Sequence, residues 1–118
     1  MPRPTAIRLK RAERVLEVDF DSGECFRFSC EFLRVHSPSA EVQGHGPDQR
    51  VLQVGKEQVA ISAVEQVGNY AVLLRFDDGH DTGIFSWSYL LDLGRRQSEL
   101  WQAYLDAVAA AGRSRTET

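Results

Sequence analysis

The chain has 118 residues, a formal net charge of −3 and a hydrophobic share of 42%. This length and composition allow one hydrophobic core, which excludes a disordered protein and leaves no room for a large second domain. The acidic balance argues against a dedicated nucleic-acid-binding protein, because neutralising several phosphates requires a basic surface. No apolar segment approaches the roughly 20 residues of a membrane span, so we expect a cytoplasmic protein with no membrane or nucleic-acid partner.

The N-terminal segment is locally basic, because the first fourteen residues contain five Lys or Arg side chains and a single acidic one, Glu13. Such a segment is typical of exposed charges on a strand and its turn. A patch that binds an acidic partner is the alternative, and the sequence leaves it open.

Alternating apolar residues at 15–20 and 25–30 flank a turn at residues 21–23 and predict a β-hairpin. The alternation places Cys30 in the core and leaves Cys25 more exposed. We expect both thiols to be reduced, since their spacing matches neither a redox pair nor a zinc knuckle. Residues 31–35 form a short helical turn at most, and the Ser, Pro and Gly-rich segment 37–47 forms a loop.

The middle of the chain continues as strands. Residues 51–54 and 59–61 are predicted as strands around a turn at Gly55 and Lys56. Gly68 and Asn69 have the turn chemistry that joins two tightly paired antiparallel strands, 64–67 and 70–76. The second of these has apolar residues on both faces, which indicates a central strand.

The last third becomes helical. A strand at 82–85 is followed by Ser86, which can cap a short helix that stops at Gly94. A longer helix from about residue 96 to 111 carries a stripe of aromatic and aliphatic residues that we expect to pack on the core. The sequence thus predicts a single α+β domain over residues 1–112, with a mostly antiparallel sheet packed against the C-terminal helix and a disordered tail at 113–118.

No complete catalytic motif is present: the glycines fit neither a P-loop nor a dinucleotide fingerprint, and no serine lies in a nucleophile elbow. Cys25 has no nearby His in the sequence and is expected to be a bystander thiol. None of His36, His45 and His80 has a carboxylate two residues further on, as an iron oxygenase commonly does. We therefore expect the protein not to be an enzyme.

Two polar loops nevertheless contain residue types that bind metals. Their members are His36, Ser37, Ser39, Glu41 and His45 in the first loop, and Asp77, Asp78, His80 and Asp81 in the second. Both loops follow strands of what we expect to be one sheet, so they can meet and offer imidazoles and carboxylates to zinc or iron. The alternative is that Ser37–Pro38 begins a helical turn and Asp78–Gly79 forms an ordinary turn.

Several segments together resemble one known family, the gamma-butyrobetaine hydroxylase-like N-terminal domain family, over roughly residues 5–112. They are Leu16-x-Val18 with Asp21-Ser22-Gly23, Phe32-Leu33-Arg34, the segment 37–42, Gly68-Asn69-Tyr70, and the segment 78–87 that runs from Asp-Gly-His to Trp. The resemblance is to the short free-standing bacterial members. It implies the fold, and it implies that the iron and 2-oxoglutarate chemistry of the family's oxygenases belongs to a separate catalytic domain.

In those oxygenases the domain holds a structural zinc ion with three cysteines and one histidine. The cysteine positions correspond to Ser37, Ser39 and Val42 of this chain, and the histidine to His80. Serine is a poor zinc ligand and valine is none, so the resemblance supports the fold without supporting the zinc site. It implies that His80 and Trp87 contribute instead to a hydrogen-bonded turn and to packing.

The leading hypothesis is therefore a non-catalytic protein-interaction module, monomeric or weakly dimeric and without a cofactor, whose protein partner is unknown. Its candidate partner-binding residues are Arg34, His36, His45, Asp78, His80 and Asp81. The alternative is an accessory protein that binds iron, zinc or an iron–sulfur centre, which the resemblance suggests because family members occur fused to iron–sulfur carrier proteins. If His80 is a simple turn residue, its replacement by alanine costs little stability.

Overall fold

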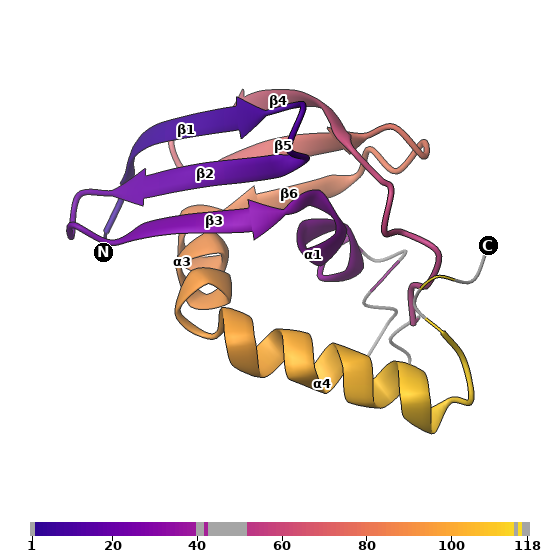
Figure 1. Cartoon of the computed structure of the whole chain (residues 1–118). Coiled ribbons are helices and arrows are strands. Elements are labelled where there is room, and N and C mark those ends of the chain that lie inside the picture. Colours follow the sequence, from indigo (N-terminus) through magenta and orange to yellow (C-terminus); the bar gives the residue numbers. More distant parts are fainter. Residues whose placement is uncertain (1, 40–41, 43–51, 115, 117–118) are drawn as a thin grey trace.

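The computed structural model describes residues 2–39, 42, 52–114 and 116, and in this part the chain forms two three-stranded antiparallel sheets and three helices (Figure 1). The first sheet has the order β1-β2-β3 and the second β4-β5-β6. The strands are β1 Pro4–Lys10, β2 Val15–Phe20, β3 Cys25–Ser29, β4 Ile61–Val67, β5 Ala71–Phe76 and β6 Gly83–Ser86, and the helices are α1 Cys30–Val35, α3 Trp87–Arg95 and α4 Gln97–Ala110. The predicted α+β class is confirmed.

The core lies between the two sheets. The inward residues of β2 are Leu16, Val18 and Phe20, and they belong to the same buried cluster as the alternate residues of β5. Helix α3 closes this cluster with three buried leucines, at 90, 91 and 93. The alternation of β2 and the central position of β5 were both predicted from the sequence, and both are confirmed. No helix of the described residues combines the length and apolar character that crossing a bilayer requires.

The expected arrangement of the strands needs two corrections. The strands form two sheets and not one, and β4 begins only at Ile61. Residues 52–54 form no strand: Leu52 and Val54 pack beside a second apolar cluster formed by α1 and α4, and the Tyr104 hydroxyl donates a 2.6 Å hydrogen bond to the Gln53 carbonyl. Side-chain packing and this hydrogen bond hold the segment without strand partners.

Helix α1 is longer than the single turn expected. The Ser29 hydroxyl caps it by accepting a 3.0 Å hydrogen bond from the Phe32 N–H, and the helix begins at Cys30, where a strand residue was predicted. All six helical residues are buried, with Cys30 only 1% exposed. The expected contrast with Cys25 is confirmed, since that thiol is exposed.

Helix α3 begins as predicted but continues past Gly94 to Arg95. The Ser86 hydroxyl accepts a 3.1 Å hydrogen bond from the Tyr89 N–H, which is the expected cap. Gly94 lies inside the helix, where its backbone packs closely against β3. A Cβ atom at this position would come within 2.5 Å of the Phe26 ring. This glycine therefore permits close packing against the first sheet, and the expected helix stop at this residue is wrong.

Candidate functional site

Four polar side chains meet where the turn between β5 and β6 lies against the segment that follows α1. The Ser37 hydroxyl lies 2.8 Å from His80 Nε2 and also accepts a 3.3 Å hydrogen bond from the Ser39 N–H. The Ser39 hydroxyl lies 2.8 Å from the Thr82 hydroxyl. These contacts form what we call the Ser37–His80 network, and they join residues 43 positions apart in the chain.

The Ser37–His80 network is buried, and its burial limits the chemistry that its side chains can perform. Ser37 is 0% exposed and His80 is 5% exposed. A Cβ atom at Gly83 would lie 2.5 Å from Ser37 Oγ, so the β6 backbone covers the hydroxyl. A serine beside a histidine can act as a nucleophile only if a substrate reaches it. The network is therefore structural, and we expect His80 to contribute more to stability than an exposed turn residue would.

The four positions that correspond to the family's zinc ligands do not fit a zinc ion in this chain. Ser37 and Ser39 offer hydroxyls where thiolates are needed, and His80 Nε2 is already hydrogen-bonded to Ser37. Val42 is 1% exposed and has no donor atom. In the described part of the chain, no three His, Cys, Asp or Glu side chains lie close enough together to hold a metal ion.

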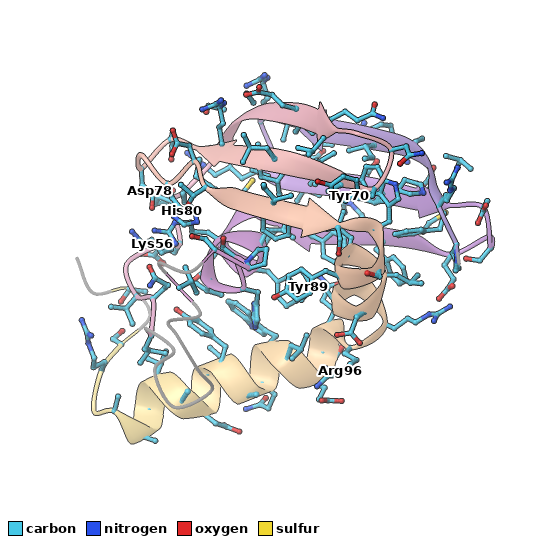
Figure 2. All side chains as sticks on the ribbon, turned by 180° about the vertical axis from the view of Figure 1, so that it is seen from behind. Lys56, Tyr70, Asp78, His80, Tyr89 and Arg96 are labelled. Atoms are coloured by element: carbon cyan, nitrogen blue, oxygen red, sulfur yellow. The ribbon has the colours of Figure 1, made fainter. Side chains whose placement is uncertain are left out.

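Two basic side chains and one backbone N–H contact an aspartate of the same turn. Both Arg34 Nε and Lys56 Nζ donate 2.9 Å hydrogen bonds to Asp78 Oδ2, and the backbone N–H of His80 donates to Asp78 Oδ1 at 3.2 Å. Figure 2 shows Lys56, Asp78 and His80 gathered at one end of the second sheet. Burial alone would raise the pKa of Asp78, but the hydrogen bonds from Lys56, His80 and Arg34 outweigh it and lower the pKa to about 2.

Replacing Asp78 with asparagine should lower the free energy of unfolding at neutral pH by about 1–2 kcal/mol. A carboxyl group whose pKa falls on folding stabilises the protein above its unfolded pKa, near 3.8, and this contribution disappears as the pH falls to about 2. Urea unfolding of both proteins across this range should therefore show the difference in stability shrinking with acidification. A difference that stays constant down to about pH 2 would contradict the prediction.

The remaining candidate residues are divided between two places. His36 is buried: its Nδ1–H donates to the Phe32 carbonyl at 2.8 Å, and its own carbonyl accepts a 2.6 Å hydrogen bond from the Tyr89 hydroxyl. Asp81 is exposed and pairs with Arg75 Nη1 at 3.3 Å. His45 and Glu41 lie outside the described residues. Lys56 and Thr82 were not predicted at the site, because a single Lys or Thr in a turn carries no signal of a distant contact.

A cavity of about 390 Å³ lies next to His36, between the end of α1, residues 52–53 and α4. Its lining is mainly apolar and includes Val35, Leu52, Leu100 and Ala107. The Tyr104 side chain lines this cavity, and its hydroxyl donates a hydrogen bond to the Gln53 carbonyl. Among the described residues, the cavity therefore offers a mainly apolar lining bordered by the His36 and Tyr104 side chains.

Comparison with known proteins agrees with the fold. The family model described as "Gamma-butyrobetaine hydroxylase-like, N-terminal" matches residues 7–91. An NMR solution structure is 48% identical, with a TM-score of 0.85 over 100% of this chain and 94% of the other. A second NMR structure is 54% identical, with a TM-score of 0.83 over 98% of this chain and 86% of the other.

A crystal structure at 1.93 Å of a protein of unknown function of the DUF971 family, from Acidithiobacillus ferrooxidans ATCC 23270, is 42% identical. Its TM-score is 0.66 over 78% of this chain and 92% of that protein. A search of curated proteins found no match. With the family model covering most of its length, the chain belongs to the gamma-butyrobetaine hydroxylase-like N-terminal family.

Proposed function

We propose that this chain is a non-catalytic protein-interaction module whose contact surface is the outer face of the β4-β5-β6 sheet. One observation carries the proposal: Ile84, a large apolar side chain on the edge strand β6 of this face, is 47% exposed. An exposed isoleucine that continues into neighbouring apolar side chains offers a partner an apolar anchor.

The strand register shows which side chains share this outer face with Ile84. Leu73 pairs with Ile84 on one side and with Glu65 on the other, so the three lie in one row across the sheet. Val67 and Ala71 pair in the next row of the same face. Cross-strand partners lie side by side. Ile84, Leu73 and Val67 therefore form a short apolar strip beside Glu65 and over the buried Ala71, which we call the β5–β6 face. In Figure 2 strands β4–β6 lie in front.

The outer face of the first sheet is built in the opposite way. Arg8, Glu17 and Arg27 lie in one row across it. They are joined by ion pairs of 3.0 Å on each side of Glu17, and Arg8 also contacts Asp19 at 2.9 Å. A charged row of this kind is well solvated and offers no apolar anchor to a partner. The contrast between the two faces supports a contact on the second sheet.

The rim of the β5–β6 face suggests the chemistry of the partner. Arg75 lies at its edge and pairs with both Glu65 and Asp81, so the rim carries one positive and two negative charges. A partner that inserts an apolar side chain and surrounds it with basic residues complements this surface. Of the predicted partner-binding residues, the exposed Asp78 and Asp81 can take part directly, whereas the buried Arg34 and His80 support the turn from inside. His36 is buried away from this turn, against Phe32 and Tyr89.

Replacing Ile84 with glutamate should reduce partner binding at least about tenfold, because it places a charge where an apolar anchor is needed. Thr5→Glu is the matched control, since it adds the same charge at an exposed position of β1. Tagged wild-type protein and both variants would be expressed in the native host, the co-purifying protein identified, and its affinity for each variant measured by calorimetry.

The result expected is a basic protein that binds the wild type and Thr5→Glu equally well and Ile84→Glu weakly. A partner that binds all three equally would show that the contact lies elsewhere, and concentration-dependent sedimentation of the purified wild type would show that the partner is a second copy. The alternative of a metal-binding accessory protein has no observation in its favour among the described residues, where no group of metal ligands assembles.

A further inference from the structure

An unusual charge arrangement lies where the end of α1, the segment before β4 and the β5–β6 turn come together. Arg34 and Lys56 both donate to one oxygen of Asp78, so two positive charges share a single negative one. The two other aspartates of this turn are engaged elsewhere: Asp77 accepts from the Ala60 N–H at 3.1 Å, and Asp81 pairs with Arg75. The three side chains of Arg34, Lys56 and Asp78 therefore carry a net charge of +1.

The Arg34 guanidinium also has a buried hydrogen-bonding group that is not used. Arg34 is 7% exposed, its Nε–H is directed to Asp78, and its Nη1 is buried without a hydrogen-bond partner. Among the residues that the structure describes, Nη1 of Arg34 is the one buried side-chain nitrogen or oxygen in this condition. A buried charged donor without an acceptor is costly, and such donors in native proteins usually have a partner.

We propose that Arg34 and Lys56 form a binding site for a carboxylate, with Arg34 Nη1 as its inner donor and Lys56 Nζ at its mouth. With Nε engaged by Asp78, Nη1 remains as a charged N–H donor, and a carboxylate oxygen is an acceptor that forms a strong, charge-assisted hydrogen bond with such a group. The single net positive charge suits a monoanion, because Asp78 would repel a more highly charged phosphate. The side chains of Lys56 and Asp78 are 24% and 22% exposed, so this ion pair lies at the protein surface.

The carboxylate can belong to a small organic acid or to the free C-terminus of a peptide, since both present the same group. This site lies at the turn beyond the apolar strip of the β5–β6 face, and its existence does not depend on the proposed protein interaction. A failure of one proposal therefore leaves the other standing, because Ile84 contributes nothing to the carboxylate site and Arg34 nothing to the apolar strip.

The test is an NMR titration of ¹⁵N-labelled full-length protein at neutral pH and constant ionic strength. The probes are sodium acetate, inorganic phosphate, and one short peptide with either a free or an amidated C-terminus. We expect saturable shifts of the Arg34 Nε–H and the His80 backbone N–H with acetate and with the free peptide. A free peptide that binds more tightly than acetate identifies a C-terminus as the ligand, and equal binding identifies a small acid.

Three variants make the test specific. Lys56→Gln should weaken acetate binding about tenfold, because it removes one charge-assisted hydrogen bond. Asp78→Asn should strengthen it at least about threefold, because a repelling carboxylate is removed while the two cations remain. Arg75→Gln, which removes an exposed arginine of the same sheet, should leave it unchanged.

The proposed carboxylate site would be disproved by shifts that do not saturate. It would also be disproved by shifts that are the same in Lys56→Gln as in Arg75→Gln. Weaker binding by Asp78→Asn would overturn it as well, provided that the variant's amide spectrum shows that it is folded. Tighter binding of phosphate than of acetate would overturn the assignment to a carboxylate. Equal binding of the amidated and the free peptide would show that the peptide contacts lie elsewhere and would remove the C-terminus from the proposal.

Discussion

Replacing Phe32 with alanine is expected to lower the free energy of unfolding by about 3–5 kcal/mol, the typical cost of removing a buried aromatic ring. The Phe32 ring is 2% exposed and lies between two apolar clusters. Its centroid is 5.9 Å from Phe28 on the sheet side, and 4.4 Å from His36 and 6.4 Å from Trp101 on the α4 side. The cavity left by its removal would separate α4 from the core.

Urea unfolding followed by tryptophan fluorescence measures this loss, because Trp101 lies next to the deleted ring. Tyr70→Ala is the control: Tyr70 is an aromatic residue that is 56% exposed, and its replacement should cost less than about 1 kcal/mol. A loss below about 1.5 kcal/mol for Phe32→Ala would mean that the two clusters are stable independently of each other.

Replacing Gly83 with alanine is the second substitution with a large expected effect, a loss of about 1–3 kcal/mol. The new Cβ atom would lie 2.5 Å from Ser37 Oγ and 3.1 Å from the Phe85 ring, so Ser37 must move away. That movement breaks the buried hydrogen bond between Ser37 Oγ and His80 Nε2, and the lost bond adds to the steric cost. The change is one methyl group, yet it disrupts the centre of the Ser37–His80 network.

A double-mutant cycle tests this cause directly. Ser37→Ala removes the hydroxyl that the new methyl group contacts, so Gly83→Ala should cost at least about 0.5 kcal/mol less in that background than in the wild type. Gly79→Ala is a poor control because Gly79 has a φ of +92°, whereas Ile84→Ala changes an exposed neighbour on the same strand. Additive losses for Gly83 and Ser37 would show that the strain comes from Phe85.

The parts of the fold that follow from local chemistry were predictable. The pairing of β4 with β5 followed from the turn residues Gly68 and Asn69, and it is confirmed. The connection has three residues and not the expected two, because Val67 pairs with Ala71 and β5 begins there. Gly68 has a φ of +55°, a conformation that favours glycine. The burial of Leu16 and Val18 followed from period-two alternation. In each case one or two neighbouring residues determine the conformation, so the sequence alone contains the information.

Other features depend on contacts between distant residues and could not be predicted from a local pattern. Gly94 resembles a helix stop, but its role is to admit Phe26 from a strand nearly seventy positions earlier. Residues 52–54 alternate like a strand but lie in the structure against α1 and α4. Tertiary packing overrides local preference in both places.

The candidate site was predicted in a similar, partial way. The family resemblance implied that Ser37 and His80 correspond to positions around one centre, and the structure places them 2.8 Å apart. Neither the resemblance nor the residue types indicated that Arg34 is buried or that Lys56 reaches Asp78. A salt bridge between residues 44 positions apart leaves no trace in a single sequence.

The order of the strands in the two sheets bears on how the chain reaches its folded state. Each sheet consists of strands that are consecutive in the sequence, β1-β2-β3 and β4-β5-β6. Every hydrogen-bonded strand pair therefore closes only a short loop, and the entropy lost in bringing the two strands together is small. The contacts that join distant parts of the chain are those between the inner faces of the two sheets, so the larger loss of chain entropy accompanies the docking of one sheet on the other.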